Sequence, residues 1–321
     1  MSGMFTYIRY SIRNRMEIPM KQPRVCIAMA TYNGAAHMRI QFESLLKQTY
    51  ENFVVVIRDD GSTDDTVAIV KEYQDRYPDR FVLLEDDGAN LRCPGSFYRI
   101  LQTCEPADYY GFCDQDDYWK PEKIACAVEA LEKLDGEGKL YLGSYDYYTQ
   151  DHQYIRAFPK QQVPITLAKV IYHTPASGFT LMFDEKIRRK YICEVDPGTE
   201  MHDRWLIRCA VCFEQVVYDE RSLAEHIRFE ESVTAEDAGN KKLLTHFIKD
   251  ELMSDVAVEA KKDLCYFEQI FGAQLTPQDA KLIHTFTKAH GWGRKLFFPH
   301  RMRARIPGEI ALRILFLIGK I

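Results

Sequence analysis

The sequence predicts an α/β fold: a Rossmann-like, mostly parallel, twisted sheet flanked by helices, with a C-terminal helical extension. Three observations indicate it. Apolar runs of strand length alternate with amphipathic segments over residues 24–113, polar loops follow the apolar runs, and residues 236–291 have helical periodicity. Strands separated by helices at this spacing are typical of βαβ units and therefore of a parallel sheet.

The first half of the chain predicts four strands with helices between them. The apolar runs have the length of buried strands and lie at 25–30, 53–57, 81–84 and 108–113. The segments between them have helical periodicity and lie at 37–48, 62–77 and 96–104. Ser62 or Thr63 is expected to cap the second helix. Asp64 and Asp65 are expected to act as favourable charges in the first turn of this helix rather than as ligands.

The second half has a less regular pattern. Its expected extended segments lie at 139–148, 178–183 and 214–218. Its expected helices lie at 164–172, 201–212, 236–271 and 277–290, and a short apolar helix begins at Pro307. The 321 residues are enough for one large domain with this helical extension.

Composition and charge exclude some classes of protein. No segment reaches the roughly 18 uninterrupted apolar residues of a membrane span, and residues 1–20 show no secretory signal. The nine cysteines are scattered and several lie within apolar runs, which favours reduced thiols in a cytosolic protein. The whole chain has a net charge of −5, although residues 292–321 are basic. An acidic body with a basic tail is not typical of a nucleic-acid-binding protein.

An aromatic, apolar run ends in three carboxylates at Asp114, Asp116 and Asp117. Three acidic side chains at the end of a strand concentrate negative charge, which is costly unless a cation neutralises it. Hard divalent ions such as Mg²⁺ or Mn²⁺ prefer carboxylate oxygens and often bind through one or two of them plus substrate phosphates. Because ligands bind at the carboxyl ends of the strands of such sheets, the polar loops 31–34 and 58–62 are expected beside this cluster.

Four motifs occur in order along the chain. They are Ala-Thr-Tyr-Asn-Gly at 30–34, Arg-Asp-Asp-Gly-Ser-Thr-Asp at 58–64, Asp-Gln-Asp-Asp-Tyr-Trp at 114–119 and Met-His-Asp-Arg-Trp at 201–205. In this register they resemble the successive motifs of family 2 glycosyltransferases with the GT-A fold. The likeness is greatest to the bacterial rhamnosyltransferase-like branch, which builds cell-wall, capsular and O-antigen polysaccharides. It covers about residues 22–235.

The resemblance implies a nucleotide-sugar site. Its expected residues are Thr31, Tyr32, Asn33, Asp59, Asp60, Asn90, Asp114, Gln115, His202, Arg204 and Trp205. The ring of Tyr32 is expected to stack on a pyrimidine base. Asp60 is expected to accept a hydrogen bond from N3–H of uracil or thymine, because a carboxylate only accepts. Asp59 either reaches the ribose or caps the turn, and Arg204 and Trp205 either contact a ligand or pack structurally.

The resemblance also implies the catalytic groups. Asp116, with Asp114, is expected to hold Mg²⁺ or Mn²⁺ across the donor diphosphate. Asp203 is expected to be the general base of an inverting transfer. Asp117 either supports the metal ligands or caps the following helix, and His202 either orients the base or caps a turn.

Two positions depart from the family pattern. Arg92 stands where the family often has the glycine of an Asn-x-Gly segment, here beginning at Asn90. The approach of the backbone to the ligand is therefore expected to differ. Phe229 stands where the branch usually has a histidine, and whether His226 replaces it is left open.

We therefore expect an inverting, metal-dependent hexosyltransferase that moves a sugar to a growing cell-surface polysaccharide or lipid-linked glycan. L-rhamnose from dTDP-rhamnose is the first choice of donor. A UDP-sugar-dependent transferase of the same fold and a catalytically inactive scaffold that binds a glycan or a partner are the alternatives. The expected segments are a leader at 1–22, the GT-A domain at 23–235, a helical extension at 236–291 and a tail at 292–321. Within the GT-A domain, the nucleotide-binding half is expected to end at about residue 120 and the acceptor half to begin at about residue 121.

The tail is basic and aromatic and ends in a short apolar helix. That helix is too short to span a bilayer. It is expected to lie among anionic headgroups, which would place a cytoplasmic protein peripherally on the inner face of the cell membrane. The alternative is that it docks on the protein's own body or on a second subunit of a homodimer.

Overall fold

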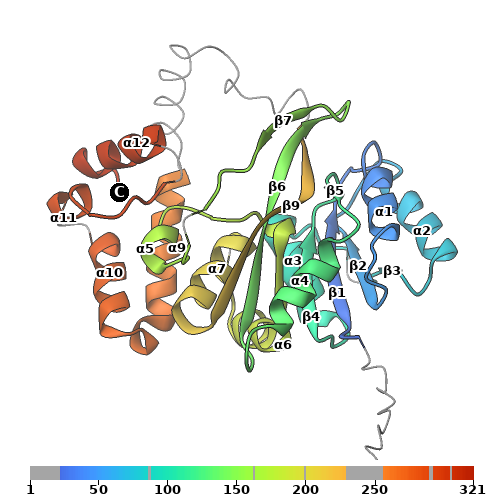
Figure 1. Cartoon of the computed structure of the whole chain (residues 1–321), viewed down its shortest axis with the longest axis horizontal. Helices are drawn as coiled ribbons and strands as arrows, with labels where there is room; N and C mark the ends of the chain where they lie inside the picture. The colour runs from blue at the N-terminus through green and yellow to red at the C-terminus, as the bar shows by residue number, and fades with distance from the viewer. Residues whose placement is uncertain are drawn as a thin grey trace, which may run out of the picture.

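The computed structural model describes residues 22–85, 88–161, 163–198, 200–228, 256–288, 292–303 and 306–321. One nine-stranded sheet runs through the molecule in the order β3-β2-β1-β4-β8-β6-β9-β5, and β7 pairs with β6. Helices cover both faces of the sheet, and a group of C-terminal helices packs at one side (Figure 1). The expected leader and the start of the expected helix 236–271 lie outside the described residues.

The first half forms a parallel sheet, as the sequence predicts. Its strands are β1 (Val25–Thr31), β2 (Phe53–Asp59), β3 (Phe81–Leu83) and β4 (Tyr109–Cys113). β1 pairs in parallel with β2 and β4, and β2 pairs in parallel with β3. The helices between them are α1 (Met38–Leu46), α2 (Thr66–Arg76) and α3 (Arg92–Thr103).

The second half is mixed and partly antiparallel. Its strands are β5 (Tyr118–Trp119), β6 (Lys139–Thr149), β7 (Tyr154–Ala157), β8 (Leu181–Asp184) and β9 (Gln215–Arg228). β8 lies antiparallel between β4 and β6, whereas β9 runs parallel to β6. Its helices are α4 (Lys123–Glu132), α5 (Leu167–Val170), α6 (Glu185–Arg188), the π-helix η2 (Arg189–Cys193) and α7 (His202–Phe213), with a 3₁₀ turn η1 (Gly178–Thr180).

Alternate residues of the central strands bury opposite faces of the sheet. On β1, Val25 and Ile27 belong to one apolar cluster, and Cys26 and Ala28 belong to the other. All four are essentially inaccessible to solvent. Burial on both faces explains why these strands are continuous apolar runs rather than alternating ones. It leaves only the strand ends open to a ligand.

The C-terminal helices extend the core on the side of α7. They are α9 (Val256–Phe271), the 3₁₀ turn η4 (Gly272–Gln274), α10 (Pro277–Thr287), α11 (Trp292–Leu296) and α12 (Ile306–Leu317). Phe267 and Phe271 on α9 pack on Trp205 of α7, with ring centroids 6.0 and 5.8 Å apart. The helical extension therefore shares one apolar core with the second half of the sheet.

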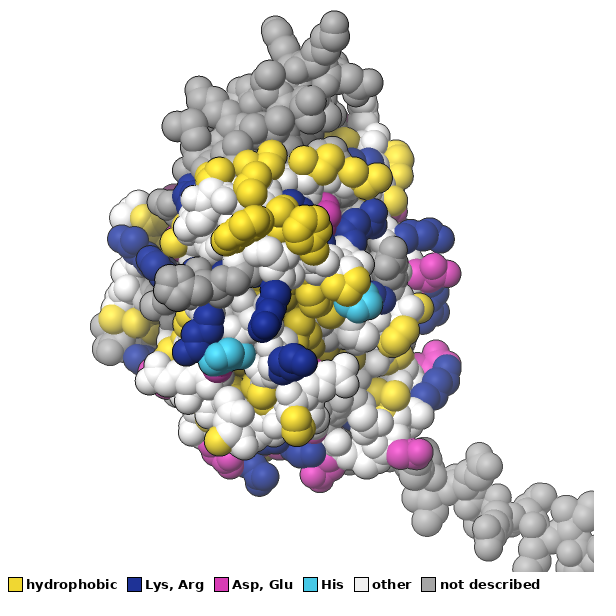
Figure 2. Space-filling view, turned by 90° about the vertical axis from the view of Figure 1, so that its left-hand side faces the viewer, with side chains coloured by type: hydrophobic (Ala, Val, Ile, Leu, Met, Phe, Trp, Pro, Cys, Tyr) yellow, Lys and Arg dark blue, Asp and Glu magenta, His cyan; other side chains and the backbone are white. Residues whose placement is uncertain are grey.

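Helix α12 docks on the protein with one face and leaves another face in solvent. Its buried side chains include Leu312, Leu315 and Phe316, whereas Ile310 and Leu317 are exposed. Figure 2 shows this side of the molecule: hydrophobic side chains gather in one band, and Lys and Arg side chains gather beside it. The inner face of the helix belongs to the core, as the docking alternative expects, and contact of its outer face with a membrane stays a prediction.

Candidate active site

Polar residues from three strand ends meet in one cavity. The cavity has a volume of about 200 Å³ and lies at the carboxyl ends of β1, β2 and β4. Six of the expected site residues line it: Thr31, Tyr32, Asp60, Asp114, Gln115 and Asp116. Residues at the start of α3 close it, including Arg92, Cys93 and Phe97. The expectation that these loops converge is confirmed.

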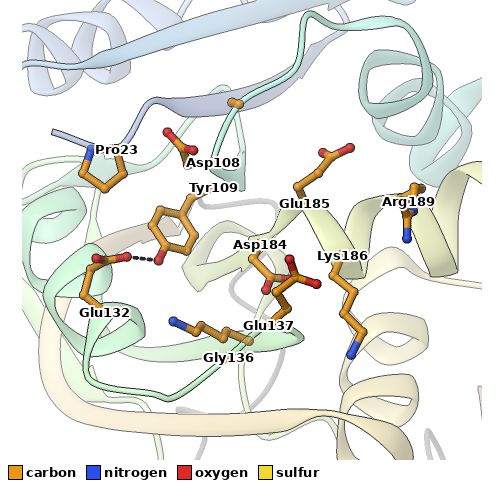
Figure 3. A pocket seen from close by; sticks show the side chains of 12 residues that line it. Pro23, Asp108, Tyr109, Glu132, Gly136, Glu137, Asp184, Glu185, Lys186 and Arg189 are labelled. Carbon is orange, nitrogen blue, oxygen red and sulfur yellow. Dashed lines mark hydrogen bonds between the residues drawn. The ribbon is translucent and has the colours of Figure 1, made fainter. Parts of the chain in front are cut away.

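A larger cavity of about 550 Å³ lies elsewhere, at the start of β4 (Figure 3). Tyr109, the first residue of β4, points into it and donates a hydrogen bond to Glu132. In open α/β sheets, ligands bind beyond the carboxyl ends of the strands. The smaller cavity is therefore the better candidate for the active site.

The loops after β1 and β4 are tied together by one side-chain amide. The Tyr32 backbone N–H donates to Gln115 Oε1 (3.0 Å), and Gln115 Nε2 donates to the Tyr32 carbonyl (3.1 Å). A Cβ on Gly34 would overlap the Gln115 amide, so glycine is required for this approach. The backbone of Tyr32 is thus held while its side chain, 52% exposed, remains open at the cavity.

Asp60 is buried at the cavity, and several donors hold its carboxylate. Its Oδ1 accepts from Arg58 Nη1 (2.6 Å) and from the Leu91 N–H (2.7 Å), and its Oδ2 accepts from the Arg92 N–H (2.7 Å). Burial raises the pKa of Asp60, but these donors outweigh it and lower the pKa below its usual range. An ionised carboxylate only accepts hydrogen bonds, so any bond that Asp60 makes to a ligand in the cavity is with a donor group of that ligand.

Arg92 takes a backbone conformation that favours glycine. Its φ is +56°, in the left-handed region. Glycine adopts this conformation without strain, so the glycine that the family often has at this position would fit the turn. The expected difference in the approach of the backbone to a ligand stays a prediction. Asn90 Nδ2 donates to the Asp60 carbonyl (2.9 Å), so Asn90 braces this turn.

Asp59 and Asn33 hold the loops in place rather than lining the cavity. Asp59 Oδ1 accepts from the hydroxyls of Thr31 and Ser62, and its Oδ2 accepts from the N–H groups of Gly61 and Ser62. Four accepted bonds fill the usual capacity of a carboxylate. These contacts are those of the capping alternative, and a contact of Asp59 with the ribose stays a prediction. Asn33 accepts from the Thr63 N–H (2.8 Å) in the same way.

The acidic cluster brings three carboxyl groups close enough to affect one another. Burial, and then the charges of Asp117 and Asp116, raise the pKa of Asp114 well above its usual range. Asp117 is buried and pairs with His226, whose Nδ1 lies 2.8 Å from its Oδ1. Asp114 and Asp116 have no side-chain hydrogen bond or ion pair within the described residues. Their oxygens remain available to an external cation.

This donor set fits a divalent ion that is completed by phosphate. Nowhere in the described part of the chain are three or more His, Cys, Asp or Glu residues grouped so that they could hold a metal ion by themselves. Mg²⁺ is usually bound through one or two carboxylates plus substrate phosphates rather than by an all-protein cage. Asp114 and Asp116 at the cavity provide two carboxylates of this kind.

Asp203 lies in the first turn of α7, close to the acidic cluster. Its charge contributes to the raised pKa values of Asp114 and Cys93, so the three groups interact electrostatically. Asp203 Oδ1 accepts from the Arg204 N–H (2.6 Å), and the side chain is half-buried. Asp203 does not itself line the 200 Å³ cavity.

His202 is buried behind the cavity. Its ring packs on Phe97 and Phe112, with centroids 4.6 and 4.3 Å away, and burial lowers its pKa. A Cβ on Gly178 would overlap the imidazole, and neither ring nitrogen has a hydrogen-bond partner among the described residues. Phe97 lines the cavity and His202 does not, so the expected direct contact of His202 with a nucleotide-sugar has no support in this structure.

Arg204 and Trp205 connect α7 to the rest of the protein. Arg204 Nη1 forms an ion pair with Asp263 on α9 (2.7 Å). Trp205 is fully buried, and its Nε1 donates to the Tyr191 carbonyl (2.8 Å). These contacts are those of the packing alternative, and a contact of either residue with a ligand stays a prediction.

Two buried ion pairs around the site were not predicted from the sequence. Arg58 supports Asp60, and its adjacency to the Asp-Asp pair in the second motif was the available signal. Arg208 lies within α7 and forms an ion pair of 2.5 Å with Glu200, which lies just before this helix. Burial raises the pKa of Glu200 to about 7, although Arg208 opposes the shift. No local pattern in the sequence distinguishes the two residues of this buried pair from charged residues on the surface. Phe229 lies outside the described residues.

Sequence comparison places the chain among sugar-transferring enzymes. The model of "Glycosyl transferase family 2" matches residues 26–188. An uncharacterized glycosyltransferase of Rickettsia felis is 28% identical over 235 residues, covering 70% of this chain and 36% of that protein. The dTDP-rhamnosyl transferase RfbG of Shigella flexneri is 36% identical over 105 residues, covering 32% of this chain and 36% of that protein. The chain thus spans about a third of the length of these relatives.

Solved structures share the GT-A-type fold. S. aureus TarS 1-349, in complex with UDP-GlcNAc, matches with a TM-score of 0.53 at 16% identity and covers 92% of both chains. The mannosyltransferase PcManGT of Pyrobaculum calidifontis, in complex with GDP-Man and Mn²⁺, matches with a TM-score of 0.50 at 14% identity, covering 94% of this chain and 89% of that one. The two neighbours hold donors with different bases, so the fold alone does not decide the nucleotide.

Proposed function

The chain belongs to glycosyl transferase family 2, and from this premise we propose that it transfers a sugar with inversion from a pyrimidine nucleotide-sugar to a glycan. One observation carries the proposal: Tyr32, Asp60, Asp114 and Asp116 line a single cavity at the carboxyl edge of the sheet. The first-choice donor is dTDP-L-rhamnose, because a dTDP-rhamnosyl transferase is among the relatives. The acceptor is a growing cell-surface polysaccharide or a lipid-linked glycan.

Each residue at the cavity has a distinct role in this proposal. Tyr32 stacks on the base, and Asp60 Oδ2 accepts the base N3–H. Asp114 and Asp116 would hold Mg²⁺ or Mn²⁺, which when bound supplies Lewis-acid stabilisation of the leaving diphosphate. Asp203 removes the proton of the acceptor hydroxyl as the sugar carbon is attacked. In this arrangement the donor lies between the base-binding residues and the acidic cluster.

The base preference follows from the acceptor-only chemistry of Asp60. Uracil and thymine present N3–H as a donor, so UDP and dTDP are expected to raise the melting temperature of the protein more than GDP does. A thermal-shift series with the three diphosphates, each with and without Mn²⁺, measures this. Larger stabilisation by GDP would overturn the pocket assignment and the proposed donor class.

Tyr32→Ala is expected to weaken binding of the preferred diphosphate by roughly 5- to 150-fold, because stacking on an aromatic ring contributes about 1–3 kcal/mol per base. Isothermal titration calorimetry with UDP or dTDP measures the loss. Tyr154→Ala is the matched control, since Tyr154 is 58% exposed and does not line the cavity. Equal affinities of the two variants would show that Tyr32 is not part of the base site.

Peripheral membrane contact is proposed through the outer face of the C-terminal helices. The exposed apolar side chains there include Trp292, Phe297, Ile306, Ile310 and Leu317. Lys and Arg side chains lie beside them (Figure 2). In interfacial binding, cations that are attracted to an anionic membrane surface act together with apolar side chains that enter it. None of the helices in the described ranges is long and apolar enough to cross a membrane.

Phe297→Ser combined with Ile310→Ser is expected to weaken binding to anionic vesicles without loss of fold, because both side chains are exposed. Vesicle co-sedimentation and a thermal melt measure the two effects. Val82→Ser combined with Val163→Ser is the control, since these valines are also exposed but lie outside the tail. Deleting the tail is a poorer test, because Leu312 and Phe316 belong to the core. Unchanged sedimentation of the first variant would contradict the proposed contact.

A further inference from the structure

Three free cysteine side chains lie close together at the C-terminal end of α3. Cys26 is buried on β1, Cys104 is the C-cap of α3, and Cys193 ends η2. Cys104 Sγ and Cys193 Sγ each lie 3.9 Å from the same Leu101 carbonyl oxygen. The thiols of Cys26 and Cys104 are hydrogen-bonded to each other. The fold thus brings together a thiol cluster from three elements that are far apart in the sequence.

The side chain of Arg188 on α6 is fixed beside the thiol cluster. Its Nη1 donates to the Leu101 carbonyl (2.6 Å) and to Cys193 Sγ (3.4 Å). Arg188 also forms an ion pair with Glu185 (2.7 Å), so part of its charge is balanced within α6. The cluster therefore has a cationic neighbour that is held in place by the protein itself.

Cys26 and Cys104 differ in exposure and in acidity. Cys26 is 1% exposed, whereas Cys104 is only partly buried, so Cys104 is the more accessible of the two. The hydrogen bond with Cys26 lowers the pKa of the Cys104 thiol; burial opposes this shift, and the charge of Arg188 adds to it. The same hydrogen bond, together with burial, raises the pKa of Cys26. Cys104 is therefore the first of the two to form a thiolate, which is the nucleophilic form of cysteine.

We propose that Cys104 and Cys26 are an oxidation site at which hydrogen peroxide forms a disulfide. The Cys104 thiolate attacks one peroxide oxygen and the O–O bond breaks. Cys104 becomes a sulfenic acid, and the hydroxide that leaves takes up the proton that Cys104 released. The Cys26 sulfur then attacks the Cys104 sulfur, the S–O bond breaks, and hydroxide leaves as water with the Cys26 proton. Two thiols lose two electrons in all, and the peroxide is reduced to two water molecules.

Cys26, rather than Cys193, is the expected partner of Cys104. A disulfide holds its two sulfur atoms about 2.0 Å apart, so thiols that are already in contact need the least movement. Cys26 is hydrogen-bonded to Cys104, whereas Cys193 directs its contacts to the Leu101 carbonyl and to Arg188. The bond joins β1 to the C-terminal end of α3, and the candidate active site lies at the other end of this helix.

Peptide mapping of the wild type tests the pairing without any substitution. The reduced protein is treated with hydrogen peroxide, the peroxide is removed with catalase, and the protein is denatured in excess iodoacetamide. Non-reducing digestion with chymotrypsin separates Cys104 from Cys113, since aromatic residues lie between them. We expect a peptide that links Cys26 to Cys104, equal loss of alkylation at both residues, and reversal by dithiothreitol. A link from Cys104 to Cys193, or oxidation of Cys104 without loss at Cys26, would overturn the proposal.

Single substitutions assign the role of each thiol. Cys104→Ser is expected to abolish the link and to leave Cys26 fully alkylated, because the buried thiol then has no oxidised partner. Cys193→Ser removes the third thiol of the cluster, and Cys265→Ser removes an exposed thiol on α9. Both of these variants are expected to form the link as the wild type does. Oxidation of Cys26 that persists in Cys104→Ser, or loss of the link in Cys193→Ser, would contradict the assignment.

Thermal melts give a readout that does not depend on digestion or on sugar transfer. Peroxide treatment is expected to raise the melting temperature of the wild type, because a cross-link between residues far apart in the sequence restricts the unfolded chain. The rise is expected to disappear when dithiothreitol is added and to be absent in Cys104→Ser. An equal rise in the wild type and in Cys104→Ser would count against a disulfide at this site.

Discussion

Asp203→Asn is expected to lower the rate of sugar transfer by roughly 10²–10⁴, the usual contribution of a general base. An amide cannot take the proton of the acceptor hydroxyl, whereas the carboxylate in the first turn of α7 can. Donor binding is expected to survive, because Asp203 does not line the cavity that we assign to the nucleotide. Steady-state kinetics give the loss in kcat, and calorimetry with the nucleoside diphosphate gives the affinity.

The substitution is conservative for the fold. Asp203 Oδ1 accepts from the Arg204 N–H, and the asparagine oxygen can accept the same bond. Asp196→Asn is the matched control, since Asp196 Oδ1 accepts from the Gly198 N–H in the loop before α7. Near-native kcat in the Asp203 variant would make Asp203 a structural residue and require another carboxylate as the base.

Asp116→Asn is expected to abolish measurable transfer and to remove the Mn²⁺ dependence of nucleotide binding. Asp116 lines the cavity, and within the described residues its carboxylate has no protein partner. Asparagine has nearly the same shape but lacks the charge that a divalent ion requires. Turnover assays and nucleotide titrations with and without Mn²⁺ measure the two effects.

Asp65→Asn is the control for this change. Asp65 is the N-cap of α2, with an exposed side chain that makes no capping hydrogen bond. The two variants have the same net charge, so a general electrostatic effect would lower activity in both. Unchanged turnover in Asp116→Asn would show that this residue is not part of the metal site.

The parallel half of the fold was predictable because both faces of its strands are buried. Residues such as Val25 and Cys26 must both be apolar when each faces a different core cluster. The result is a continuous apolar run whose length identifies a strand.

The second half was harder to predict because its strands depend on distant partners. The expected strand at 178–183 begins as a 3₁₀ turn and becomes β8 only at Leu181, where it pairs with β6. The extended segment at 214–218 is the beginning of β9, which continues to Arg228 alongside β6. Long-range pairing of this kind leaves little local signal.

The candidate site was predictable where strand ends alone place a residue. Asp60, Asp114 and Asp116 follow from that rule. The rule does not say whether a polar side chain faces the ligand or the loop. Asp59 uses its acceptor capacity within a turn, and His202 points into an aromatic cluster. Both outcomes depend on neighbours that are far apart in sequence.

Release of nucleoside diphosphate tests the central claim most directly, because it needs no knowledge of the acceptor. The wild type, Asp116→Asn and Asp65→Asn are each incubated with UDP-, dTDP- and GDP-sugars, with and without Mn²⁺. We predict release from a pyrimidine donor that requires Mn²⁺, that persists in Asp65→Asn and that is lost in Asp116→Asn. No release by the wild type from any donor, or undiminished release by Asp116→Asn, would contradict a metal-dependent glycosyltransferase with its donor in this cavity.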